Sequence, residues 1–111
     1  MKINTKEQIV EEFAKAWEDL NAETIISYLD DSFVYDSQWV FESLDCKRYI
    51  EYIRGKFKAI KESNSTPVVE IVPDNYCGGT MIRLKQGDNT PAFYRIEVKD
   101  GKVIKGDLCM F

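Results

Sequence analysis

Residues 21–41 read NAETIISYLDDSFVYDSQWVF, and this stretch contains the change from helix to strand on which the fold depends. Asn21 can cap a short helix, because the apolar residues Ile25, Ile26 and Leu29 fall on one side of it. Asp30-Asp31-Ser32 is expected to end that helix. Residues 33–41 are rich in aromatic and β-branched side chains, which predicts an extended segment with a bend near Asp36.

Two longer amphipathic helices are predicted on either side of this stretch. Asn4 or Thr5 can cap the first, and Asp45 can cap the third, which runs to about residue 63. Apolar residues recur in them every three or four positions and predict two buried faces. These residues are Ile9, Val10, Phe13, Trp17 and Leu20 in the first helix, and Tyr49, Ile50, Ile53, Phe57 and Ile60 in the third. We expect Phe13, Trp17, Ile53 and Phe57 to share one core.

The second half of the chain is predicted to form four strands, at residues 68–72, 80–85, 92–99 and 103–110. Their connections contain glycine and asparagine, which favour hairpins, so the sheet should be mostly antiparallel. Alternation predicts one apolar sheet face, formed by Ala92, Tyr94, Ile96 and Val98 in the third of these strands and by Ile104, Leu108 and Met110 in the last. Segregated helices and strands predict an α+β fold in a single domain, residues 1–111, with a curved sheet wrapped around a long helix.

Composition limits the chemistry open to this chain. It has 111 residues, of which 44% are apolar and 31% are charged, as in an ordinary globular domain. The chain contains no histidine, which excludes Ser-His and Cys-His catalysis and histidine-ligated zinc. Cys46, Cys77 and Cys109 form no CxxC pair. We therefore expect no metal, no cofactor and no disulfide framework.

Charge and hydropathy indicate the partners and the location. The net charge of −4 does not favour nucleic acid or an anionic membrane as a partner. Basic residues do gather on the third helix, but they lie all around it, and we interpret them as a solvated surface. Residues 1–8 carry charges where a signal peptide needs an apolar stretch, and no apolar run is long enough to span a membrane. A cytoplasmic location is expected.

The order of elements resembles the nuclear transport factor 2-like family, which includes SnoaL-like cyclases and ketosteroid isomerase. The resemblance covers essentially the whole chain and is carried by three marks: the first helix running into Asn21-Ala22, the run Leu29–Asp36 with the sequence LDDSFVYD, and the final DGKVI hairpin from Asp100. It implies a cone-shaped, cystatin-like roll with an apolar pocket, and a homodimer formed through the outer sheet face. The family also contains members without enzyme activity, and a fold alone does not choose among them.

The resemblance also implies a catalytic pair. Ketosteroid isomerase-like members place a carboxylate base in a pattern that Asp30, Asp31, Val34 and Asp36 match, which makes Asp36 the candidate general base. Tyr94 stands where that enzyme has a protonated aspartate and is the candidate hydrogen-bond donor. Phe13 replaces the enzyme's tyrosine donor, so the pair of donors is not reproduced. The alternatives are a turn-capping or salt-bridged Asp36 and a core Tyr94.

Aromatic residues supply the candidate lining of a ligand pocket. At least half of the aromatic residues between positions 35 and 57 must belong to the core. The candidates are Phe13, Trp17, Tyr35, Trp39, Tyr52 and Phe57. Arg83 and Arg95 should face outward and pair with acids such as Glu97 or Asp107. Phe93 shares that outer face and is expected at a homodimer interface. The leading expectation is binding of a small, largely apolar ligand in the cone. The alternatives are isomerase or cyclase chemistry through Asp36 and Tyr94, and a non-catalytic protein-interaction domain with a filled cone.

Overall fold

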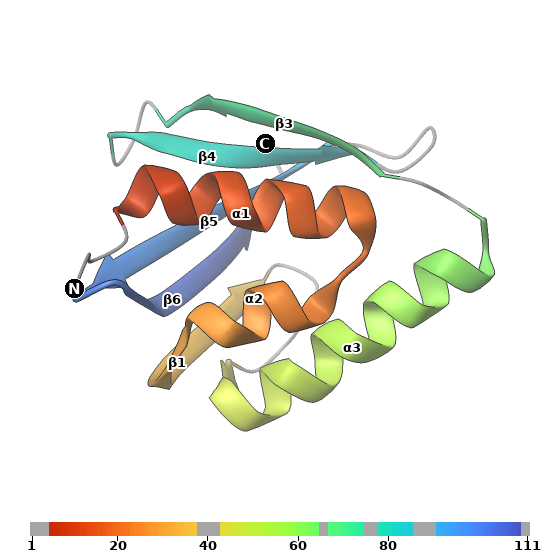
Figure 1. Ribbon diagram of the computed structural model, residues 1–111, viewed down its shortest axis with the longest axis horizontal. Helices are drawn as coiled ribbons and strands as arrows, with labels where there is room; N and C mark the ends of the chain where they lie inside the picture. Colours follow the sequence, from red (N-terminus) through yellow and green to blue (C-terminus); the bar gives the residue numbers. More distant parts are fainter. Residues whose placement is uncertain (1–4, 38–42, 65–66, 75–77, 86–90, 110–111) are drawn as a thin grey trace.

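The computed structural model describes residues 5–37, 43–64, 67–74, 78–85 and 91–109, which form three helices and a six-stranded sheet (Figure 1). The helices are α1 (Lys6–Asp19), α2 (Ala22–Tyr28) and α3 (Cys46–Glu62). The strands are β1 (Leu29–Ser37), β2 (Leu44–Asp45), β3 (Val68–Pro73), β4 (Thr80–Lys85), β5 (Ala92–Lys99) and β6 (Lys102–Cys109). The α+β class predicted from the sequence is confirmed.

Side chains close to each helix start satisfy the free backbone N–H groups. Thr5 caps α1, and its side chain and that of Gln8 form a reciprocal capping box. The Asn21 side chain accepts a hydrogen bond from the Glu23 N–H at 3.2 Å at the start of α2. Asp45 does the same for the Arg48 N–H at 2.9 Å and so starts α3. These local contacts explain why the sequence predicted the helix starts.

The sheet has the strand order β2-β1-β6-β5-β4-β3 and is not closed. Neighbouring strands are antiparallel except for β1 and β6, which are parallel. The pairing of β1 with β6 joins the first long strand to the last, so the N-terminal and C-terminal halves of the chain share one sheet. All three helices cover the same face of this sheet, which we call the inner face (Figure 1).

The strand β1 begins earlier than predicted. It starts at Leu29, directly after α2, so Asp30, Asp31 and Ser32 belong to the strand and not to a turn that precedes it. The Asp30 carboxylate accepts hydrogen bonds from the Ser32 N–H and hydroxyl, at 3.0 and 2.6 Å. The pairing register with β6 shifts between Leu29 and Val34. Residues 30–32, which form hydrogen bonds among themselves, therefore make an irregularity within the strand.

The strand β6 departs from the alternation that we predicted. Ile104 was expected on the apolar face, but it is only half-buried, and Val103 is fully buried in its place. The cause is a bulge: Val103 pairs with Val98 and Lys105 pairs with Glu97, so Ile104 is an extra residue between two paired positions. Met110 lies outside the described residues.

One hydrophobic core lies between the helices and the inner face of the sheet. The predicted core residues Phe13, Trp17, Ile53 and Phe57 are all buried in it, as the helical spacing indicated. Tyr94 and Ile96 of β5 and Leu108 of β6 reach it from the sheet. α1 packs on β3, β4 and β5, whereas α3 packs on β1 and β2.

Candidate functional site

Asp36, the candidate general base, points to the outer face of the sheet. Phe33 and Tyr35 of the same strand are buried, whereas 43% of the Asp36 side chain is exposed. The Asp36 carboxylate accepts a hydrogen bond from the Ser43 hydroxyl through Oδ1, and its Oδ2 lies 4.0 Å from Nζ of Lys105. This is the salt-bridged arrangement that the sequence left open for Asp36.

A second carboxylate, that of Asp107, adjoins Asp36 on the neighbouring strand. Asp36 and Asp107 are directly paired in the register of β1 and β6, and Nζ of Lys105 also lies 3.9 Å from Oδ2 of Asp107. Burial raises the pKa of Asp107; Lys105 opposes this effect, and the Asp36 charge adds to it. The positive charge of Lys105 therefore lies close to two carboxylates, those of Asp36 and Asp107, which would otherwise repel each other.

Tyr94, the candidate donor, lies on the inner face. Its ring stacks with that of Tyr35 at a centroid distance of 6.1 Å, and its hydroxyl lies 3.1 Å from the hydroxyl of Tyr49. Burial raises the pKa of both Tyr49 and Tyr94, so both hydroxyls stay protonated at neutral pH. Because Tyr35 faces Tyr94 and the next residue, Asp36, faces outward, the structure does not bring the two candidate catalytic side chains together.

The space between the helices and the sheet is occupied by a cluster of aromatic rings. We call this set the aromatic cluster; it consists of Phe13, Phe33, Tyr35, Tyr49, Tyr52 and Tyr94. The ring centroids of Tyr49 lie 4.6 Å from Tyr35 and 4.9 Å from Phe33, and those of Phe13 and Tyr94 are 6.1 Å apart. These are contact distances for aromatic pairs, so these rings pack against one another between the helices and the sheet.

The residues expected to line a ligand pocket are mostly core residues. Phe13, Trp17, Tyr35 and Phe57 are buried, and Tyr52 is half-buried. Trp39 lies outside the described residues. Trp17 packs edge-on against Phe57 at 4.7 Å between ring centroids. Its indole Nε1 is buried and finds no hydrogen-bond partner, the one such side-chain atom among the residues that the structure describes.

The structure reveals a buried ion pair that the sequence did not suggest. Asp74 follows β3, its side chain is 0% exposed, and its carboxylate accepts hydrogen bonds from Nε and Nη2 of Arg95 at 2.6 and 3.3 Å. We had expected Arg95 to pair with Glu97 or Asp107 on the sheet surface. The only feature of the sequence that marks this position is that Asp74 follows Pro73, just after the predicted strand at residues 68–72. Arg83 does face outward and pairs with Glu70 at 3.2 Å across β3 and β4.

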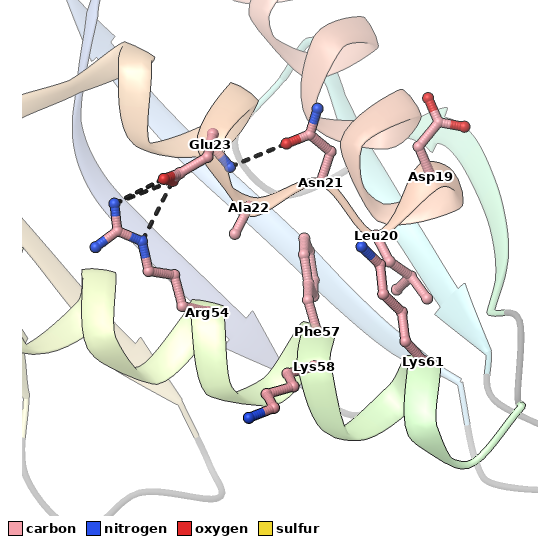
Figure 2. Close-up of a pocket in the computed structure, with 9 residues that line it drawn as sticks. All are labelled: Asp19, Leu20, Asn21, Ala22, Glu23, Arg54, Phe57, Lys58 and Lys61. Atoms are coloured by element: carbon pink, nitrogen blue, oxygen red, sulfur yellow. Dashed lines mark hydrogen bonds and ion pairs between the residues drawn. The ribbon is translucent and has the colours of Figure 1, made fainter.

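A pocket of about 500 Å³ opens on the helical side of the molecule, between the α1–α2 turn and α3 (Figure 2). We call it the helix-side pocket; it is lined by Asp19, Leu20, Asn21, Ala22, Glu23, Arg54, Phe57, Lys58 and Lys61. Phe57 is the only predicted pocket residue in this lining. Arg54 and Glu23 form a forked ion pair at its rim, with Nη2 of Arg54 2.7 Å from Oε1 of Glu23.

Within the described parts of the chain, no group of three or more Cys, Asp or Glu side chains is placed to hold a metal ion. No helix in those parts is long and apolar enough to cross a membrane.

No protein-family model matches the sequence, and neither does any curated protein. Solved structures do match its fold. A SnoaL-like protein of unknown function from Burkholderia thailandensis has a TM-score of 0.73 at 18% identity, over 99% of each chain. A nuclear transport factor 2-like protein of unknown function from Cytophaga hutchinsonii has a TM-score of 0.65 at 15% identity, over 100% of this chain and 93% of that one.

An enzyme is also among the matching structures. An LEH-like epoxide hydrolase from M. tuberculosis has a TM-score of 0.63 at 18% identity, over 95% of this chain and 81% of that one. The chain therefore has the nuclear transport factor 2-like fold, as its order of elements predicted. The matching structures include both an enzyme and proteins of unknown function, so the fold does not decide the activity.

Proposed function

We propose that this nuclear transport factor 2-like chain is a non-catalytic interaction domain. The observation that carries the proposal is the aromatic cluster, whose rings and the paired hydroxyls of Tyr49 and Tyr94 occupy the space between helices and sheet. A site for a small apolar ligand needs open volume, and a general base needs access to the reacting atom. The positions of Asp36 and Tyr94 on opposite sheet faces give the isomerase alternative little support.

The partner that we propose is a second copy of this chain, bound through the outer face of the sheet. The helices pack on the inner face, so no helix covers the outer face (Figure 1). Several of its charges are matched within the chain, through Lys105 with Asp36 and Asp107 and through Arg83 with Glu70. These pairs lower the cost of packing this part of the face against a copy of itself.

Phe93 supplies the apolar part of this proposed interface. It is half-buried, and it lies on the same side of β5 as Arg95 and Glu97 and between its register partners Arg83 and Cys109. Val34 of β1 and Val68 of β3 add exposed apolar surface, at 37% and 56% exposure. Large apolar side chains at the centre and charges around them are typical of protein interfaces.

The experiment is a measurement of mass in solution by light scattering, over protein concentrations up to tens of micromolar. We expect a dimer that Phe93→Asp weakens, because the new carboxylate would be buried without a partner. Ile71→Asp is the control: Ile71 is 43% exposed, and it pairs with Ile82, whose side chain lies in the core, so it is on the side of the sheet opposite to Phe93. A monomer throughout, or a dimer that Phe93→Asp leaves intact, would contradict the proposal.

A second measurement separates this proposal from ligand binding in the cone. If the aromatic cluster is closed, a neutral apolar probe such as naphthalene should leave tyrosine fluorescence unchanged apart from a linear background. Saturable quenching that is lost in Tyr94→Ala would instead favour the ligand-binding alternative. Turnover that disappears in Asp36→Asn would favour the isomerase alternative.

A further inference from the structure

We infer that the helix-side pocket binds a small organic carboxylate with an apolar body, independently of any dimer. The pocket measures about 500 Å³, which lies within the range of roughly 300–1,000 Å³ that is usual for small-molecule sites. It lies on the helical side, whereas the proposed dimer surface is the outer face of the sheet (Figures 1 and 2). A carboxylate and a second copy of the chain could therefore bind at the same time.

The pocket has a preformed apolar floor. Phe57 is only 2% exposed and points from α3 toward the α1–α2 turn, where Leu20 and Ala22 are also buried (Figure 2). The turn itself is held by the hydrogen bond from the Asn21 N–H to the Ala16 carbonyl at 2.8 Å. A ligand that meets a fixed floor of this kind loses less free energy to ordering the protein than one that must organise a loop.

The charges around this floor favour a monoanion. Arg54 is held by Glu23, and in the described part of the chain neither Lys58 nor Lys61 forms an ion pair. The lining contains Arg54, Lys58 and Lys61 against Asp19 and Glu23, which leaves one surplus positive charge in a protein whose net charge is −4. One carboxylate matches that surplus, whereas the dianion of a phosphate ester would exceed it.

Lys61 is the side chain best placed to receive the carboxylate. In Figure 2 it rises from α3 toward Leu20 on one side of the Phe57 ring, while Lys58 extends away from the α1–α2 turn and the Asp19 carboxylate points away from Phe57. A carboxylate beside Lys61 would thus place its apolar body over Phe57. Lysine on its flexible stem acts as a point charge and sets no strict geometry for the anion.

The structure also provides an optical reporter for this site. Trp17 packs edge-on against Phe57 at 4.7 Å, so a ligand bound over the Phe57 ring changes the surroundings of the indole. The chain has two tryptophans, and Trp39→Phe leaves Trp17 as the only one. Tryptophan emission in that background therefore reports on the helix-side pocket.

The test titrates the Trp39→Phe protein with phenylacetate and, in parallel, with its neutral isostere phenylacetamide. We expect a saturable change in Trp17 emission at millimolar phenylacetate and no saturable change with phenylacetamide. Lys61→Glu should raise the dissociation constant about fivefold or more, which is the scale of an exposed charge contact. Lys47→Glu is the control, because it makes the same change of charge on α3 outside the pocket lining.

Three outcomes would overturn the inference: no saturable response to phenylacetate, an equal response to phenylacetamide, or equal effects of Lys61→Glu and Lys47→Glu. Melting temperatures of the variants show whether a lost response reflects lost folding. If Lys61→Glu does not fold, Lys61→Gln takes its place and should show a smaller loss in the same direction. The mass of the protein in solution is a separate readout, so failure of this inference leaves the proposed dimer untouched.

Discussion

At the scale of single residues, Gly106 shows how closely the inner face of the sheet is packed. A Cβ atom at this position would lie 2.6 Å from the Tyr94 hydroxyl oxygen and 3.2 Å from Cζ of Phe33. We predict that Gly106→Ala destabilises the protein by about 1–3 kcal/mol through overpacking. Urea unfolding measures the change.

Gly55→Ala is the control, because a Cβ at Gly55 would meet no atom within 4 Å. Gly55 lies inside α3, where alanine is favoured over glycine by about 1 kcal/mol, so this variant should be more stable than the parent. If Gly106→Ala also stabilised the protein, the close packing of Tyr94 over β6 would be wrong.

The Tyr49–Tyr94 hydroxyl pair predicts a loss of stability at alkaline pH. Burial raises the pKa of both tyrosines above that of the unfolded chain, which is about 10. Above pH 10 the unfolded chain therefore releases protons that the folded protein retains, and the free energy of unfolding should fall as the pH rises. Urea midpoints between pH 7 and 11 measure this slope.

The double variant Tyr49→Phe/Tyr94→Phe should show a shallower slope, because it removes both raised groups. Tyr94→Phe alone leaves the Tyr49 hydroxyl buried without its partner and should cost about 1–3 kcal/mol at neutral pH. An unchanged alkaline slope in the double variant would assign the pH dependence to other groups.

At the scale of elements, the Asp74–Arg95 pair ties the end of β3 to β5 across the intervening strand β4. Asp74→Ala leaves the Arg95 side chain, which is 17% exposed, without this carboxylate. Removing one partner of a buried pair typically costs about 3–5 kcal/mol, and we predict a loss on that scale in thermal or urea unfolding.

Glu70→Ala is the matched control for Asp74→Ala. It breaks the pair with Arg83, in which the two side chains are 53% and 31% exposed. Because solvent screens such a pair, its loss should cost no more than about 1 kcal/mol. Equal costs for the two variants would show that Asp74 is not a special anchor of the β3–β4 hairpin.

At the scale of the whole molecule, one core cluster contains buried residues from all three helices and from β1, β4, β5 and β6. No element can leave this cluster without exposing the others, so we predict a single cooperative unfolding transition for the chain as one domain. Far-UV circular dichroism and tryptophan fluorescence should give coincident urea curves. Two separate midpoints would divide the chain into independent units.

The sequence alone determined where the helices start, the β3–β6 meander and the inner-facing residues of α1, α3 and β5. Thr5, Asn21 and Asp45 cap their helices through contacts only two or three residues away. Helical periodicity places Phe13 and Trp17 on one face of α1 and Ile53 and Phe57 on one face of α3, and both of these faces are buried. Features of this kind depend on residues that are close in the sequence, so a sequence pattern is enough to predict them.

Only the tertiary structure decided which side chains are neighbours in the candidate sites. Side-chain direction in a strand reverses with each residue. The bulge at Ile104 therefore places Val103, and not Ile104, in the core. In β1, Asp36 faces away from the aromatic cluster to which its neighbour Tyr35 belongs. The Arg95–Asp74 pair spans 21 residues of sequence. Contacts between distant segments depend on strand pairing and on packing, and these are fixed only when the whole chain has folded.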